Sequence, residues 1–83
     1  MPGAPMIRVC RQSEFLAHAE SLDHWVMARE RAIATLERKA AWLAEQGAAE
    51  QAARLRAAAR HLRHAAFEER LRASRLRQAA ATG

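Results

Sequence analysis

Histidine and cysteine are the residue types in this sequence that we consider first as metal ligands or catalytic groups. His61 and His64 stand three residues apart, so their imidazoles could share a metal ion on one helix face. We assign no Asp, Glu or Cys on that face as a further ligand. Di-iron bundles use a Glu-x-x-His element, and no Glu stands three residues before any His in this sequence. His18 and His24 are interpreted as solvated surface residues. The sequence therefore predicts no metal site.

A catalytic nucleophile would need a base held against it, and this chain offers little to build one. Its single cysteine, Cys10, cannot form an internal disulfide and is interpreted as a half-buried apolar side chain rather than a reactive thiol. The sequence has no glycine-rich phosphate loop and no strand-borne loop that could orient a Cys–His pair. We expect no enzyme activity, no catalytic residue, no cofactor and no small-molecule substrate.

Arginine dominates the charge of the chain. Thirteen of the fourteen basic residues are Arg, and Ala is abundant, a pairing typical of a GC-rich genome and hence of a bacterial or phage origin. Residues 1–47 are balanced in charge, whereas residues 48–83 hold eight arginines against three glutamates and so carry the whole net charge of +5. Because such a segment is typical of nucleic-acid or membrane-surface elements, each arginine has to be judged by its position.

The elements that would position these side chains are two rows of residues with a seven-residue period, one on each side of Gly47. The row before Gly47 is mostly large and apolar, and the row after it has Ala at every seventh position. The first row is Phe15, Ala19, Leu22, Val26, Arg29, Ile33, Leu36, Ala40 and Leu43, and the second is Ala48, Ala52, Leu55, Ala59, Leu62, Ala66, Glu69, Ala73, Leu76 and Ala80. Because the rows are out of phase by one residue at Gly47, we predict a chain reversal there. The alternative is a single long helix through Gly47.

The predicted fold is all-α, an antiparallel two-helix hairpin with an Ala-rich coiled-coil seam, completed into a bundle by dimerisation or a partner protein. Residues 1–12, where Gly and Pro crowd together, are expected to form an irregular N-terminal arm. Residues 13–80 are expected to form the hairpin, with Ser13 as the first N-cap and a turn near Gly47, followed by a disordered tail over 81–83. No apolar run is long enough for a membrane span or a secretory signal, so we expect no membrane partner and a cytoplasmic location.

Charged residues on one flank of the two rows predict how the helices align. In a hairpin that turns at Gly47, acidic residues of the first helix face arginines of the second. The expected pairs are Glu37–Arg56, Glu30–Arg63 and Asp23–Arg70. The same alignment puts Arg29 opposite Ala66 and Glu69 one layer away, within reach of an Arg side chain. We interpret Arg29 and Glu69, the charged residues within the rows, as a structural polar pair. The alternative is that each of these two side chains reaches water separately.

Several residues outside the rows are candidates for binding a partner. On the outer face of the second helix, an apolar pair four residues apart lies among basic side chains, an arrangement typical either of an interface anchor or of ordinary surface residues. Two tryptophans beside the rows either cover an edge of the core or dock a partner. These candidates are Arg60, His64, Phe67, Leu71, Arg75, Trp25 and Trp42.

We predict a non-enzymatic protein–protein interaction module (an adaptor, co-chaperone, inhibitor or accessory subunit) that packs helix on helix against itself, as a homodimer, or against another protein. A suitable surface is the alanine-rich flank, defined by Ala32, Ala58 and Ala65. The alternative is a basic hairpin that binds RNA or DNA non-specifically. Its phosphate contacts would come from the arginines outside the predicted pairs, Arg54, Arg60, Arg72 and Arg75. In architecture the chain resembles the plasmid RNA-binding protein Rop, a small helical hairpin that pairs into a bundle.

Overall fold

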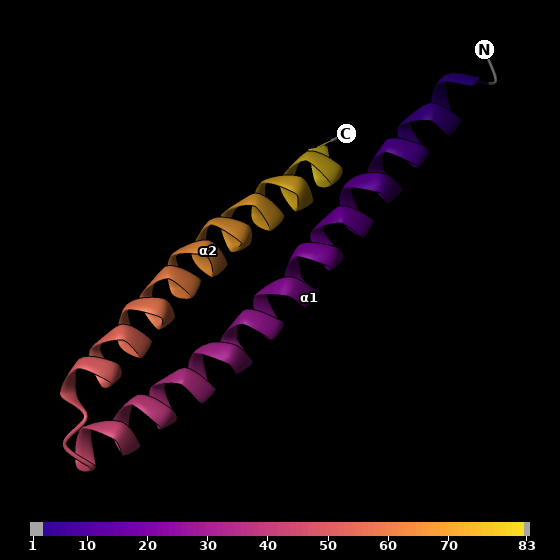
Figure 1. Ribbon diagram of the computed structural model, residues 1–83. Helices are drawn as coiled ribbons and strands as arrows, with labels where there is room; N and C mark the ends of the chain where they lie inside the picture. Colours follow the sequence, from indigo (N-terminus) through magenta and orange to yellow (C-terminus); the bar gives the residue numbers. More distant parts are fainter. Residues whose placement is uncertain (1–2, 83) are drawn as a thin grey trace.

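A computed structural model describes the backbone of residues 3–82 and the side chains of residues 11–82. Helix α1 spans Gly3–Glu45 and helix α2 spans Ala49–Thr82. The two helices lie antiparallel along each other in a thin rod with extents of 70 × 13 × 13 Å, and α1 extends past the C-terminal end of α2 (Figure 1). The predicted all-α class and the hairpin are confirmed, and the alternative of one helix through Gly47 is wrong.

The reversal at Gly47 has the geometry of a Schellman helix end. Gly47 has a φ of 83°, the left-handed conformation that a residue with a side chain adopts only at a cost. Its N–H donates to the carbonyl of Ala44 at 3.1 Å, and the N–H of Ala48 donates to the carbonyl of Leu43 at 2.9 Å. The carbonyl of Ala48 then accepts the first bond of α2, from the N–H of Ala52 at 3.0 Å. Helix α1 therefore ends at the glycine that breaks the sequence period.

The N-terminal boundary differs from the expectation. Helix α1 begins at Gly3, so the irregular arm expected over residues 1–12 is wrong for the part that the structure describes, and Ser13 lies inside a helix instead of capping one. Pro5 falls in the first turn, where a helix needs no N–H from it, and no Gly or Pro follows before Gly47. The interpretation of the Cys10 side chain lies outside the described residues.

The C-terminal boundary also differs, by two residues. Ala81 and Thr82 belong to α2, and the Thr82 hydroxyl donates to the carbonyl of Gln78 at 3.0 Å. The expected disordered tail over 81–83 is therefore wrong for these two residues, and Gly83 lies outside the described residues.

The contact between the helices buries small side chains. On α2 the buried residues are all alanines, seven residues apart, whereas α1 contributes larger apolar side chains to the same contact. The buried set is Ala19, Leu22, Val26, Ile33 and Ala40 on α1, and Ala52, Ala59, Ala66, Ala73 and Ala80 on α2. The α2 leucines Leu55, Leu62 and Leu76 are half-buried beside them. Because Ala projects little from its helix, the two backbones approach closely and the core between them is thin.

Candidate interaction surfaces

Three exposed ion pairs connect the helices along one flank of the hairpin, which we call the charged flank. The pairs are Glu37–Arg63, Glu30–Arg70 and Asp23–Arg77. Each α1 carboxylate thus meets the arginine seven residues beyond the one expected, so the predicted pairs are wrong by one seven-residue repeat. The acidic and basic residues of the flank do face each other, but in a different register.

The shift in register follows from the direction in which helical side chains point. Every Cα–Cβ bond in a helix tilts toward the N-terminus of that helix, so α1 carboxylates lean away from the turn and α2 arginines lean toward it. Glu37 lies ten residues before Gly47 and Arg63 sixteen after it, which offsets their Cα atoms by roughly 9 Å along the rod. The opposite tilts of two long side chains span this offset. Arg56, which is level with Glu37 in the backbone, leans away from it.

Arg29 and Glu69 form the polar contact within the row of buried residues. The Arg29 guanidinium donates from Nε to Glu69 Oε1 at 2.5 Å, and the side chains are 34% and 14% exposed, respectively. The structure therefore brings together the two residues that the alignment pairs, and the alternative of two separately solvated side chains does not describe it. The bond neutralises the least exposed carboxylate among the ion pairs, so it connects α1 to α2 inside an otherwise apolar contact.

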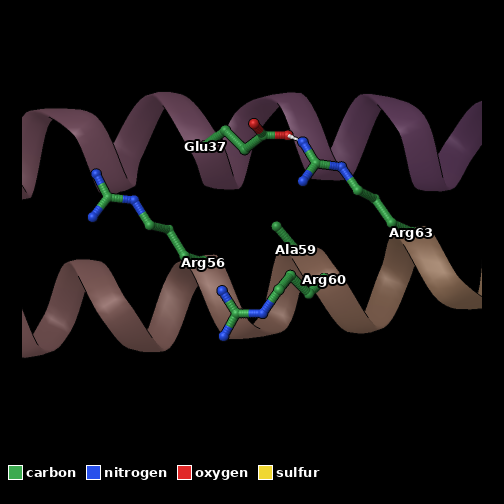
Figure 2. A pocket seen from close by; sticks show the side chains of 5 residues that line it. All are labelled: Glu37, Arg56, Ala59, Arg60 and Arg63. Atoms are coloured by element: carbon green, nitrogen blue, oxygen red, sulfur yellow. Dashed lines mark hydrogen bonds and ion pairs between the residues drawn. The ribbon is translucent and has the colours of Figure 1, made fainter.

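The shifted register leaves positive charge unpaired near the turn. Arg56, Arg60 and Arg63 line a shallow groove between the helices together with Glu37 and Ala59 (Figure 2). Figure 2 shows Arg63 bonded to Glu37, Arg56 reaching toward α1, and Arg60 lying along α2. Among residues 11–82, no carboxylate forms an ion pair with Arg56 or Arg60. Sequence reasoning paired Arg56 with Glu37 and so missed this unpaired positive charge.

The two histidines of α2 border a second groove, with Arg60 between the two grooves. His61 and His64 line it with Arg60 and Ala57. His64 Nε2 lies 3.1 Å from Oε1 of Glu68, an acidic neighbour that the sequence analysis overlooked although its four-residue spacing is the signal for such a contact. Among the described side chains, no group of three or more His, Cys, Asp and Glu residues is placed to hold a metal ion.

Phe67 lies beside the charged flank. Its side chain is 57% exposed and borders a third groove, together with Ile33 and the pair Glu30–Arg70. Leu71, one helical turn further on, is 42% exposed. The structure thus places Phe67 next to arginines, as the sequence suggested, and it places Arg60 with His64. Leu71 and Arg75 line none of these three grooves.

Both tryptophans belong to α1 and are exposed. Trp25 and Trp42 are 57% and 56% exposed, so covering an edge of the core accounts for less than half of either side chain. The Trp25 ring meets the ring of His24 edge to face, with centroids 6.0 Å apart and an interplanar angle of 72°. Trp25 stands seven residues before Ala32, which places it in line with the alanine-rich flank.

Comparison with known proteins identifies no relative. No protein-family model matches the chain, and no curated protein or solved structure is significantly similar to it. Neither helix, over the residues that the structure describes, has a stretch long and apolar enough to cross a membrane. Evidence for a function therefore comes from the arrangement and exposure of the side chains.

Proposed function

We propose that this protein is a non-enzymatic interaction module that acts by helix-on-helix packing, with a coiled-coil hairpin that a second copy or a larger protein completes into a bundle. The observation that carries this proposal is the distribution of large apolar side chains. Among the described side chains of residues 11–82, Leu22, Val26 and Ile33 are the large apolar ones that are buried, whereas six are between 42% and 58% exposed. The six are Leu16, Trp25, Met27, Trp42, Phe67 and Leu71.

A two-helix rod with so thin a core would gain stability by packing against another chain. Burial of apolar area is the main stabilising contribution to a small domain, at about 25 cal/mol per Å². Here half of the ten buried residues are the alanines of α2, which each remove little area from water. Domains of this size usually need disulfide bonds, a bound metal or an additional chain to reach ordinary stability. A further pair of helices would thicken the core and bury those exposed apolar side chains that lie on the side where it packs.

The alanine-rich flank is the surface best suited to that packing. Ala32 and Ala58 are exposed and Ala65 is half-buried, so another helix can approach both α1 and α2 closely there. Trp25, which is 57% exposed and in line with this flank, provides a large aromatic contact of the kind that dominates protein interfaces. The charged flank is less suitable, because its ion pairs would have to lose water on burial.

Sedimentation equilibrium of the full chain, followed by capture of partners on immobilised protein, tests the proposal. We expect either a concentration-dependent mass above 9.3 kDa or a captured protein that survives nuclease treatment and high salt. The Trp25→Ala/Trp42→Ala variant should lose this association while circular dichroism shows that the hairpin remains folded. If Phe67→Ala alone removes it, at a cost of about 2 kcal/mol or more, the partner packs on the outer face of α2 instead. Loss of the captured material on nuclease treatment would contradict the proposal in favour of nucleic-acid binding.

A further inference from the structure

The charged flank lacks an acid at one position. Its α1 residues recur every seven positions as Asp23, Glu30 and Glu37, and the next position holds Ala44. Because the α2 partners recur in the opposite direction, the arginine that corresponds to Ala44 is Arg56. Ala44 is exposed and has no carboxylate to offer. Arg56 thus occupies the same place in the repeat as three paired arginines, without the acid that neutralises each of them.

A second unpaired arginine stands next to Arg56. Arg60 follows four residues later on α2, a spacing that puts the two Cβ atoms about 5–6 Å apart, where like charges repel. Both side chains are exposed and line the groove shown in Figure 2. Exposed side chains change rotamer within nanoseconds, so the two guanidinium groups can turn onto one ligand. An anion in this groove would relieve the repulsion.

We propose that Arg56 and Arg60 bind a single phosphate group in the groove that they line with Ala59 and the Glu37–Arg63 pair. Two guanidinium groups carry a charge of +2, which matches the charge of nearly −2 on a phosphate monoester at neutral pH. Guanidinium also forms paired, charge-assisted hydrogen bonds to phosphate oxygens, a geometry that Lys does not reproduce. The site lies on the opposite side of the hairpin from the alanine-rich flank, so it is independent of the helix packing proposed above.

The pattern of ion pairs favours an isolated phosphate group over a nucleic-acid backbone. Further along the same flank, Arg63, Arg70 and Arg77 are each bonded to a carboxylate of α1. A nucleic acid lying along this flank would therefore meet two unpaired guanidinium groups, whereas backbone-driven binding depends on many phosphate contacts. Inorganic phosphate or a phosphate monoester can engage both Arg56 and Arg60 at once.

Titration with inorganic phosphate, at an ionic strength held constant with chloride, tests the site. The NMR resonances of the arginine Nε–H groups are the readout. We expect saturable shifts at Arg56 and Arg60, and none at Arg77, which is bonded to Asp23. Arg56→Gln should lower the affinity about tenfold or more, because it removes charge-assisted hydrogen bonds. Arg31→Gln removes the same charge from an exposed position on α1 outside the groove and should leave the affinity unchanged.

Substitution of Ala44 gives an independent test that removes no arginine. In Ala44→Glu the missing acid is supplied by α1 itself, so we expect a new ion pair with Arg56 and a loss of phosphate binding comparable to that in Arg56→Gln. Ala44→Gln has nearly the same shape without the charge and should bind phosphate like the original protein. Equal phosphate affinity in Ala44→Glu and Ala44→Gln, or a non-saturable drift of all arginine resonances together, would overturn the proposal.

A single-stranded oligouridylate of 20 nucleotides separates the two sources of phosphate. With contacts confined to Arg56 and Arg60, its affinity should fall with salt at a logarithmic slope of about 1.4 or less, since each contact contributes about 0.7 for a single strand. Inorganic phosphate should displace it. A slope several times larger that is unchanged in Arg56→Gln would show an extended nucleic-acid surface elsewhere and would contradict a confined phosphate site.

Discussion

At the scale of single residues, the contact between Arg29 and Glu69 shows how a charged pair can belong to an apolar interface. The Glu69 side chain is 14% exposed, so its carboxylate has lost most of its contact with water and depends on the guanidinium for compensation. The Arg29 side chain is 34% exposed and retains part of its hydration. The pair therefore contributes more to the alignment of the helices than to their stability.

This difference in exposure predicts that removing one partner lowers the free energy of unfolding more than removing both. Glu69→Ala leaves the Arg29 guanidinium partly buried without an acceptor and should lower the free energy of unfolding by about 1–2 kcal/mol. The Arg29→Leu/Glu69→Leu double variant replaces both charges by apolar side chains and should lose less. Urea unfolding monitored by circular dichroism gives both values. Equal and small losses in the two variants would mean that the pair is effectively solvated.

At the scale of the helices, the ion pairs of the charged flank report which register the hairpin has adopted. A double-mutant cycle on Glu37 and Arg63 should give a coupling of about 0.2–1 kcal/mol that decreases as salt is added. The matched cycle on Glu37 and Arg56 should give a coupling near zero, because these side chains lean apart. A larger coupling for Glu37–Arg56 than for Glu37–Arg63 would instead support the register expected from backbone positions alone.

The end of α1 depends on the left-handed conformation of Gly47. Apart from the neighbouring residues in the chain, no atom lies within 4 Å of a Cβ placed at this position, so a larger residue would meet no steric clash with the rest of the chain. The cost of Gly47→Ala is therefore conformational, and we expect a loss of about 1–2 kcal/mol in the free energy of unfolding. Gly47→Asn should lose less, because Asn tolerates this conformation better. Thermal unfolding of the two variants checks the order, and an Ala variant as stable as the original protein would exclude this account of the turn.

Sequence reasoning predicted the elements better than it predicted their contacts. The phase change at Gly47 indicated the hairpin because a seven-residue period constrains which face of a helix is buried. The ion pairs were assigned from backbone position, and the tilt of side chains along each helix moved Arg63 into the place expected for Arg56. The beginning of α1 was missed because Gly3 and Pro5 were interpreted as helix breakers, although a first turn accepts both.

The candidate surfaces could be predicted only in part, because exposure depends on how the two helices are rotated against each other. Phe67 was expected on the outer face from its spacing, and its 57% exposure agrees with that. For Trp25 and Trp42 the sequence allowed either a core edge or a free surface, and the structure leaves both more than half exposed. The groove at Arg56 could not be predicted at all, since it follows from the register of the ion pairs.

At the scale of the whole molecule, the protein is a long and thin rod whose core is a single layer of alanines and a few larger apolar side chains of α1. Its extents of 70 × 13 × 13 Å mean that every residue lies close to the surface, so the large apolar side chains that stay exposed could be covered only by another chain. The two flanks of the rod differ, because one carries the ion pairs and the other carries the exposed alanines Ala32 and Ala58 in line with Trp25. This division favours association through the alanine-rich flank and leaves the charged flank in contact with water.

The most direct test of this account is a quantitative comparison of the proteins captured from the native host by the original chain and by the Trp25→Ala/Trp42→Ala variant, after nuclease treatment and in high salt. We predict that the original chain retains a specific protein, either a second copy or a different partner, and that the variant loses it while remaining helical. Capture of the same material by both chains, or its release from the original chain by nuclease, would contradict the proposal that this hairpin works by helix packing on its alanine-rich flank.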